Sequence, residues 1–86
     1  RAAHVALTDA QGQPLPLGSR VQVNGQEGGQ GGGAVVGYDG WVYLDTLDVR
    51  NTLAVRTPDG AVCRAQFDWR RPEGSGLQKE RLTCGR

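Results

Sequence analysis

The chain has 86 residues, a length that supports one domain with one modest core and excludes a catalytic domain joined to a separate cofactor-binding domain. Fourteen glycines, four prolines and a hydrophobic share of 37% favour short extended segments joined by turns over long helices. Ten basic and nine acidic residues give a formal net charge of +1, so the charge favours neither nucleic acid nor an anionic membrane as a partner. We predict a single domain over residues 1–86.

The chain carries no sign of a membrane-spanning or targeting segment of its own. It contains no apolar run of about 18 residues, and its first nine residues lack the apolar centre of a secretory signal. The start at Arg1 and the absence of methionine suggest a segment of a longer polypeptide. Any export signal is therefore expected outside this sequence.

The first part of the chain predicts two strands, each with one buried face. Ala3 to Thr8 alternates so that its odd-numbered residues face a core, and Arg20 to Asn24 repeats the pattern after a turn that contains prolines. Gly25 to Gly33 then holds six glycines in nine positions. Since the Lys and Ser or Thr of a phosphate-binding loop do not follow, we interpret this segment as a connection between strands.

The eleven residues from Ala34 to Leu44 predict a β-hairpin. Two apolar strands, Ala34 to Tyr38 and Trp41 to Leu44, flank a Tyr-Asp-Gly turn. If Val42 points inward, alternation sends the aromatic residues beside it to the opposite face.

The remaining sequence predicts three further strands: Thr52 to Thr57, Ala61 to Trp69 and Arg81 to Cys84. A Pro-Asp-Gly turn separates the first two, and the charged loop Arg70 to Glu80 precedes the last. Seven short strands with a turn about every ten residues predict an all-β fold, a small seven-stranded antiparallel β-sandwich. An open barrel is the alternative.

Cys63 and Cys84 are the two cysteines of the chain, and we predict a disulfide between them. Their spacing fits no short zinc-binding pattern, and the sequence offers only His4 as a further strong ligand. A disulfide would stabilise so small a domain by about 3 kcal/mol and would place it in an oxidising compartment. Two free thiols are the alternative.

The sequence offers little support for catalysis or for a bound metal or cofactor. His4 has no serine or cysteine nucleophile in a recognisable arrangement with it, so we expect a solvated surface histidine. Asp45 and Asp48 lie in a polar turn, where solvated carboxylates are common, and fit no calcium-loop pattern. We predict that the protein is not an enzyme and has no cofactor, catalytic or metal site.

Several motifs, taken in order, resemble one family. They are Thr8-Asp9, the segment GQPLPLG from Gly12 to Gly18, the segment VVGYDGWVYL from Val35 to Leu44, and the two cysteines Cys63 and Cys84. Together these motifs, which span nearly the whole chain, resemble the C-terminal periplasmic domain of outer-membrane usher proteins. Ushers belong to the chaperone/usher pathway of pilus assembly in Gram-negative bacteria.

The resemblance implies protein binding. Ushers form a β-barrel pore, and their C-terminal domains hold complexes of a chaperone with a pilus subunit after the N-terminal domain has recruited them. The implied partners are periplasmic chaperone–subunit complexes and other usher domains. The implied location is the periplasmic side of the outer membrane, as part of a larger outer-membrane protein.

Candidate partner-binding residues are the outward aromatic residues and a cationic group. We predict that Trp41, Tyr43 and Tyr38 contribute to a partner-facing patch, and that Arg70 and Arg71, with nearby cations of the last loop and strand, form a second surface. A neighbouring loop that folds over the aromatic residues is the alternative for the patch. A passive β-sandwich spacer and a carbohydrate-binding sandwich are the alternatives for the function.

Overall fold

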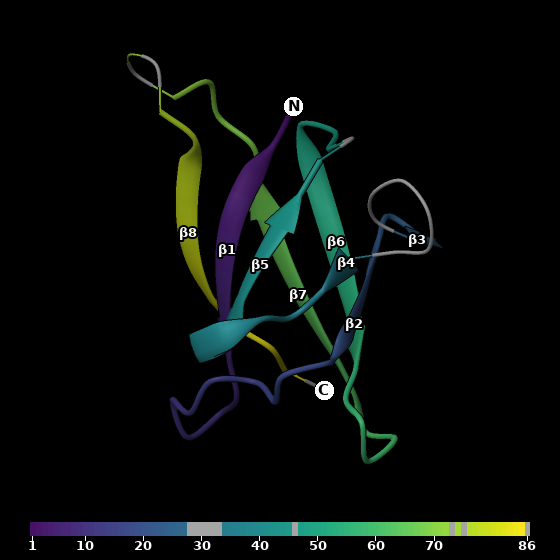
Figure 1. Ribbon diagram of the computed structural model, residues 1–86. Helices are drawn as coiled ribbons and strands as arrows, with labels where there is room; N and C mark the ends of the chain where they lie inside the picture. Colours follow the sequence, from purple (N-terminus) through teal and green to yellow (C-terminus); the bar gives the residue numbers. More distant parts are fainter. Residues whose placement is uncertain (28–33, 46, 73, 75, 86) are drawn as a thin grey trace.

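The computed structural model describes residues 1–27, 34–45, 47–72, 74 and 76–85, which form two β-sheets packed face to face (Figure 1). The predicted all-β sandwich is confirmed, and each of the seven predicted segments overlaps a strand. Most of the glycine-rich connection, residues 28–33, lies outside the described residues. Within the described ranges, no helix has the length and hydropathy needed to cross a membrane.

Sheet A has three strands in the order β5, β1, β8. The central strand β1 (Ala3–Thr8) runs antiparallel to β5 (Trp41–Leu44) and parallel to β8 (Gln78–Thr83). The prediction of antiparallel pairing is wrong for the pair β1 and β8. Since β8 reaches β1 from the opposite sheet by a crossover, no tight hairpin forces it to run antiparallel. β8 also begins before its predicted start at Arg81.

Sheet B contains the other strands in the order β3, β2, β6, β7, with β4 also paired to β2. Their bounds are β2 Arg20–Val23, β3 Gln26–Glu27, β4 Ala34–Val35, β6 Arg50–Arg56 and β7 Val62–Asp68. All the pairs in this sheet are antiparallel. The short strand β3 was not predicted. Asn24 and Gly25 form the turn before it with φ angles of 53° and 80°, as a two-residue hairpin turn of type I′ requires.

The predicted hairpin from Ala34 to Leu44 is wrong beyond its closing hydrogen bond. The Gly37 N–H donates to the carbonyl of Trp41 (2.7 Å) around the 3₁₀ turn η1 (Tyr38–Gly40). Past this point the arms diverge, because β4 pairs with β2 in sheet B and β5 pairs with β1 in sheet A. Val36 and Val42, one on each arm, are 0% and 2% exposed. Each arm therefore covers the core from a different sheet.

Gly40 makes this crossing between the sheets possible. Its φ angle is +81°, and a Cβ built there would lie 2.5 Å from the carbonyl oxygen of Leu7. That oxygen accepts a hydrogen bond from the Leu15 N–H (2.9 Å), and moving it away from Gly40 would disturb this bond. Only glycine fits this position, and β5 starts immediately after it.

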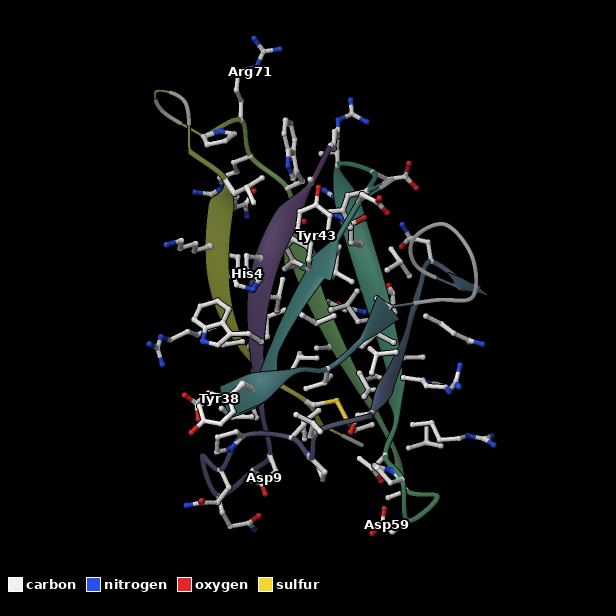
Figure 2. All side chains as sticks on the ribbon, viewed as in Figure 1. His4, Asp9, Tyr38, Tyr43, Asp59 and Arg71 are labelled. Atoms are coloured by element: carbon white, nitrogen blue, oxygen red, sulfur yellow. A yellow bond between two sulfur atoms is a disulfide. The ribbon has the colours of Figure 1, made fainter. Side chains whose placement is uncertain are left out.

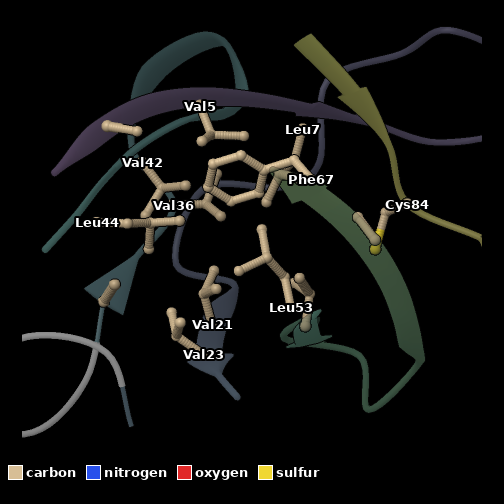
Figure 3. Packing of buried hydrophobic residues seen from close by; sticks show 14 of the residues in the cluster. Val5, Leu7, Val21, Val23, Val36, Val42, Leu44, Leu53, Phe67 and Cys84 are labelled. Atoms are coloured by element: carbon tan, nitrogen blue, oxygen red, sulfur yellow. The ribbon is translucent and has the colours of Figure 1, made fainter. Parts of the chain in front are cut away.

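Aliphatic side chains and one phenylalanine fill the space between the sheets (Figure 3). The largest contributions come from Val5, Leu7, Val42 and Leu44 of sheet A and from Val21, Val23, Leu53, Val55 and Phe67 of sheet B. The predicted inward faces of the first two strands are thus confirmed. Because side chains alternate along a strand, the outward positions of these strands face away from the core.

The predicted disulfide between Cys63 and Cys84 is confirmed. Its Cα atoms are 5.4 Å apart, and Cys84 is buried against the core. The bond joins β7 of sheet B to the residue that follows β8 of sheet A. Beside it, Arg64 and Gly85 exchange two backbone hydrogen bonds, of 2.5 and 2.8 Å. Covalent and hydrogen bonds therefore hold the two sheets together at this edge.

Candidate functional site

The outer face of sheet A brings together two of the three predicted aromatic residues. On β5, Val42 and Leu44 are buried, so alternation sends Trp41 and Tyr43 outward. The pairing of β1 with both of its neighbours aligns two rows of side chains across this face. One row is Tyr43, His4 and Lys79, and the other is Trp41, Ala6 and Arg81.

Trp41 of β5 is contacted by one side chain from each of the other two strands of sheet A. The ring centroids of His4 and Trp41 are 4.6 Å apart with the planes tilted by 33°, and the guanidinium carbon of Arg81 lies 5.9 Å from the centroid of the Trp41 ring. The first contact is an aromatic pair and the second a cation–π contact. Because the indole is already ordered, a partner that binds it loses less side-chain entropy.

The two tyrosines of the predicted patch are open to solvent. Tyr43 is 54% exposed on β5, and Tyr38 is 81% exposed on the turn η1. Figure 2 shows them on either side of His4 along the length of the molecule. Side chains of β1 and β8 contact the ring of Trp41. The structure therefore leaves Tyr38 and Tyr43 accessible, as a partner-facing patch requires.

The predicted cationic group is divided between two places. Arg70 and Arg71 lie in the connection between β7 and β8, and Figure 2 places Arg71 at the end of the molecule opposite Tyr38. Lys79 and Arg81 instead belong to the outer face of sheet A. The structure therefore does not bring Arg70 and Arg71 together with the aromatic residues, whereas the two cations of β8 lie beside them.

His4 and Asp48 each contact a neighbouring side chain, His4 by ring stacking and Asp48 by a hydrogen bond. His4, expected as a solvated surface histidine, is half-buried on the outer face of sheet A and stacks on Trp41. The sequence does not reveal this contact because β1 and β5 are far apart in the chain. Asp48 accepts a hydrogen bond from the Asn24 side chain (3.2 Å) in a network that also includes Asn51. Over the described residues, no group of three or more potential metal ligands comes together.

An open cleft of about 500 Å³ lies beside the disulfide, and no motif of the sequence predicts it. Leu15, Val62 and the two cysteines provide apolar walls, and Asp9 and Asp59 add carboxylates. Asp9 accepts backbone hydrogen bonds within its own turn. The pKa of Asp59 is lowered, chiefly by the hydroxyl of Thr57 and then by the N–H of Ala61. Both carboxylates thus stabilise the turns that carry them.

Comparison with known proteins places this chain in a family. Residues 4–71 match the family model of the PapC C-terminal domain. The chain belongs to this family. The resemblance to usher C-terminal domains is therefore confirmed.

Relatives and solved structures agree with this assignment. The usher C-terminal domain is 40% identical over 75 residues to the outer membrane usher protein AfaC of Escherichia coli, covering 86% of this chain and 8% of AfaC. It superposes on the Caf1A usher C-terminal domain with a TM-score of 0.78 at 24% identity, covering 98% of this chain and 96% of the other. For the C-terminal domain of the PapC usher the TM-score is 0.70 at 22% identity, with complete coverage of both chains. In Caf1A, conserved hydrophobic clusters on the surface of this domain are important for F1 antigen assembly.

Proposed function

We propose that this usher C-terminal domain is a non-catalytic binding domain that holds chaperone–subunit complexes during pilus assembly. In this proposal residues 1–86 fold as one unit on the periplasmic side of the outer membrane, as part of a longer usher. Other usher domains are the second class of partner. The aromatic side chains Trp41, His4 and Tyr43 on the outer face of sheet A are called the aromatic row. The observation that carries the proposal is this ordered, half-exposed aromatic row, in a domain whose family is established.

The chemistry of this face suits a partner that binds specifically and later dissociates. Tyr43 and Tyr38 are exposed aromatic side chains, of the type that dominates the energy of protein interfaces. Lys79 and Arg81 lie across β1 from Tyr43 and Trp41 and add positive charge, which accelerates association more than it strengthens binding. The importance of surface hydrophobic clusters in Caf1A supports a comparable role for this face.

Titration of the domain with a purified chaperone–subunit complex tests the proposal. Trp41→Ser combined with Tyr43→Ser should weaken binding about ten-fold or more, because two aromatic anchors are lost. The matched control is Leu17→Ser with Val49→Ser, which removes two apolar side chains that are 69% and 54% exposed elsewhere on the surface. The control should change the affinity by less than about two-fold.

The outcomes separate the alternatives. Circular dichroism must first confirm that both variants retain the fold. Unchanged affinity in the folded Trp41→Ser, Tyr43→Ser variant would remove this face from the proposal. If the unmodified domain binds no complex, the passive spacer is favoured, and binding in a glycan screen that depends on Trp41 would favour the carbohydrate-binding sandwich.

A further inference from the structure

The outer face of sheet B carries a cluster of arginines on the side of the domain opposite the aromatic row. Arg20 and Arg56 are direct partners in the ladder between β2 and β6. Arg64 pairs with Ala54, which places it diagonally beside Arg56 across β6 and β7. Val21 and Val55, their neighbours in sequence, are buried, so these arginines point away from the core. We call Arg20, Arg56 and Arg64 the arginine cluster.

Among the side chains that the structure describes, none forms an ion pair with the arginine cluster. All three side chains are exposed, and no described carboxylate oxygen lies within 4.0 Å of them. Direct cross-strand partners of the same charge destabilise a sheet. The total charge of the chain is only +1, so this density of positive charge is a property of one face and not of the whole molecule. No side-chain hydrogen bond or ion pair among the described residues accounts for this concentration of charge.

Apolar side chains flank the cluster at both ends of the same row. Val35 is the ladder partner of Arg20, and Val62 is the ladder partner of Arg56. They are 50% and 48% exposed. The row across four strands is therefore Val35, Arg20, Arg56, Val62, with the short side chain of Ala54 leaving space beside Arg64. Positive charge at the centre and apolar contact at the edges combine the two features of a protein interface.

From this arrangement we infer that the outer face of sheet B binds an acidic protein surface, whose carboxylates lie on the arginine cluster while apolar side chains contact Val35 and Val62. Guanidinium groups suit this partner because they bind carboxylates through two parallel hydrogen bonds. Vesicles of anionic lipid, the other source of negative charge, form a separate arm of the test. This face is separate from the aromatic row, so the inference goes beyond the function proposed above.

Fluorescence anisotropy with a synthetic probe tests the inference. The probe is a fluorescein-labelled peptide of alternating glutamate and valine, and its counterpart has glutamine in place of glutamate. At about 50 mM salt the acidic peptide should bind about ten-fold tighter than the neutral one, and the difference should shrink at about 150 mM salt. Arg20→Gln with Arg56→Gln should abolish most of the preference.

A charge-matched variant makes the result specific to this face. Arg70→Gln with Arg71→Gln removes the same two charges from the connection before β8 and should leave peptide binding within about two-fold of the unmodified domain. If both variants lose binding equally, net charge alone explains it and the inference fails. It also fails if vesicles with about 30% phosphatidylglycerol bind through Arg20 and Arg56 while the acidic peptide does not.

Discussion

Replacing Gly40 by alanine should destabilise the domain far more than the same change at Gly12. Both glycines have φ angles near +80°, which costs an alanine about 1–2 kcal/mol at either position. A Cβ at Gly12 has no atom within 4 Å, whereas at Gly40 it meets the Leu7 carbonyl oxygen at 2.5 Å and Pro14 Cβ at 3.2 Å. Overpacking against a fixed backbone adds about 1–3 kcal/mol. Gly40→Ala should therefore lose about 2–5 kcal/mol of unfolding free energy, against about 1–2 kcal/mol for Gly12→Ala.

Urea unfolding followed by tryptophan fluorescence measures both losses by linear extrapolation. Gly12→Ala is the control, since it shares the backbone strain and lacks the collision. A loss of about 2–5 kcal/mol is a large part of the roughly 4–13 kcal/mol expected for a domain of this size. If the two variants unfold within about 0.5 kcal/mol of each other, the close approach of Gly40 to Leu7 does not determine the crossing between the sheets.

Three further predictions concern stability. Reduction, or Cys63→Ala with Cys84→Ala, should lower the unfolding free energy by about 3 kcal/mol for a closed loop with a sequence separation of 21, and equal stability of the oxidised and reduced forms in urea would contradict this. Asn51→Ala should cost about 2–3 kcal/mol in the same assay, because it leaves the N–H and carbonyl of Asp48 without their partner; a loss below about 0.5 kcal/mol would show that water replaces the amide. The lowered pKa of Asp59 means that its contribution to stability is present above about pH 4 and is lost as the pH falls through the folded value. Asp59→Asn should therefore flatten the acid limb of the melting-temperature profile, and an unchanged profile would refute the assignment.

The sequence predicts the strands and their buried faces well, because both depend on local alternation. Val5 and Leu7 on β1, and Val21 and Val23 on β2, are buried as their spacing predicts. The family resemblance depends on motifs in sequence order and is confirmed. The disulfide was predicted because two cysteines in a small domain have few alternatives, and it is present.

The sequence does not reveal which strands pair, since pairing depends on contacts between residues distant in the chain. The hairpin from Ala34 to Leu44 has the local signals of a tight turn, yet its arms join different sheets. Each arm buries a valine against the core from its own sheet, Val36 on one and Val42 on the other. The stacking of His4 on Trp41 and the juxtaposition of Arg20 and Arg56 follow from this pairing, so neither was predicted.

The two faces of the sandwich show how binding chemistry is separated from folding. Folding fixes the inward residues of each strand, and the pairing of the strands then fixes which outward residues become neighbours. Trp41 and Arg81 are brought together by β1 between them, and Arg20 and Arg56 are brought together by the ladder of β2 and β6. A slip of one residue in either ladder would exchange inward and outward positions and bury these groups, so the register that protects the core also assembles both surfaces. Substitutions at outward positions should consequently alter binding without loss of the fold, and this independence is what makes the two proposed surfaces separable by mutation.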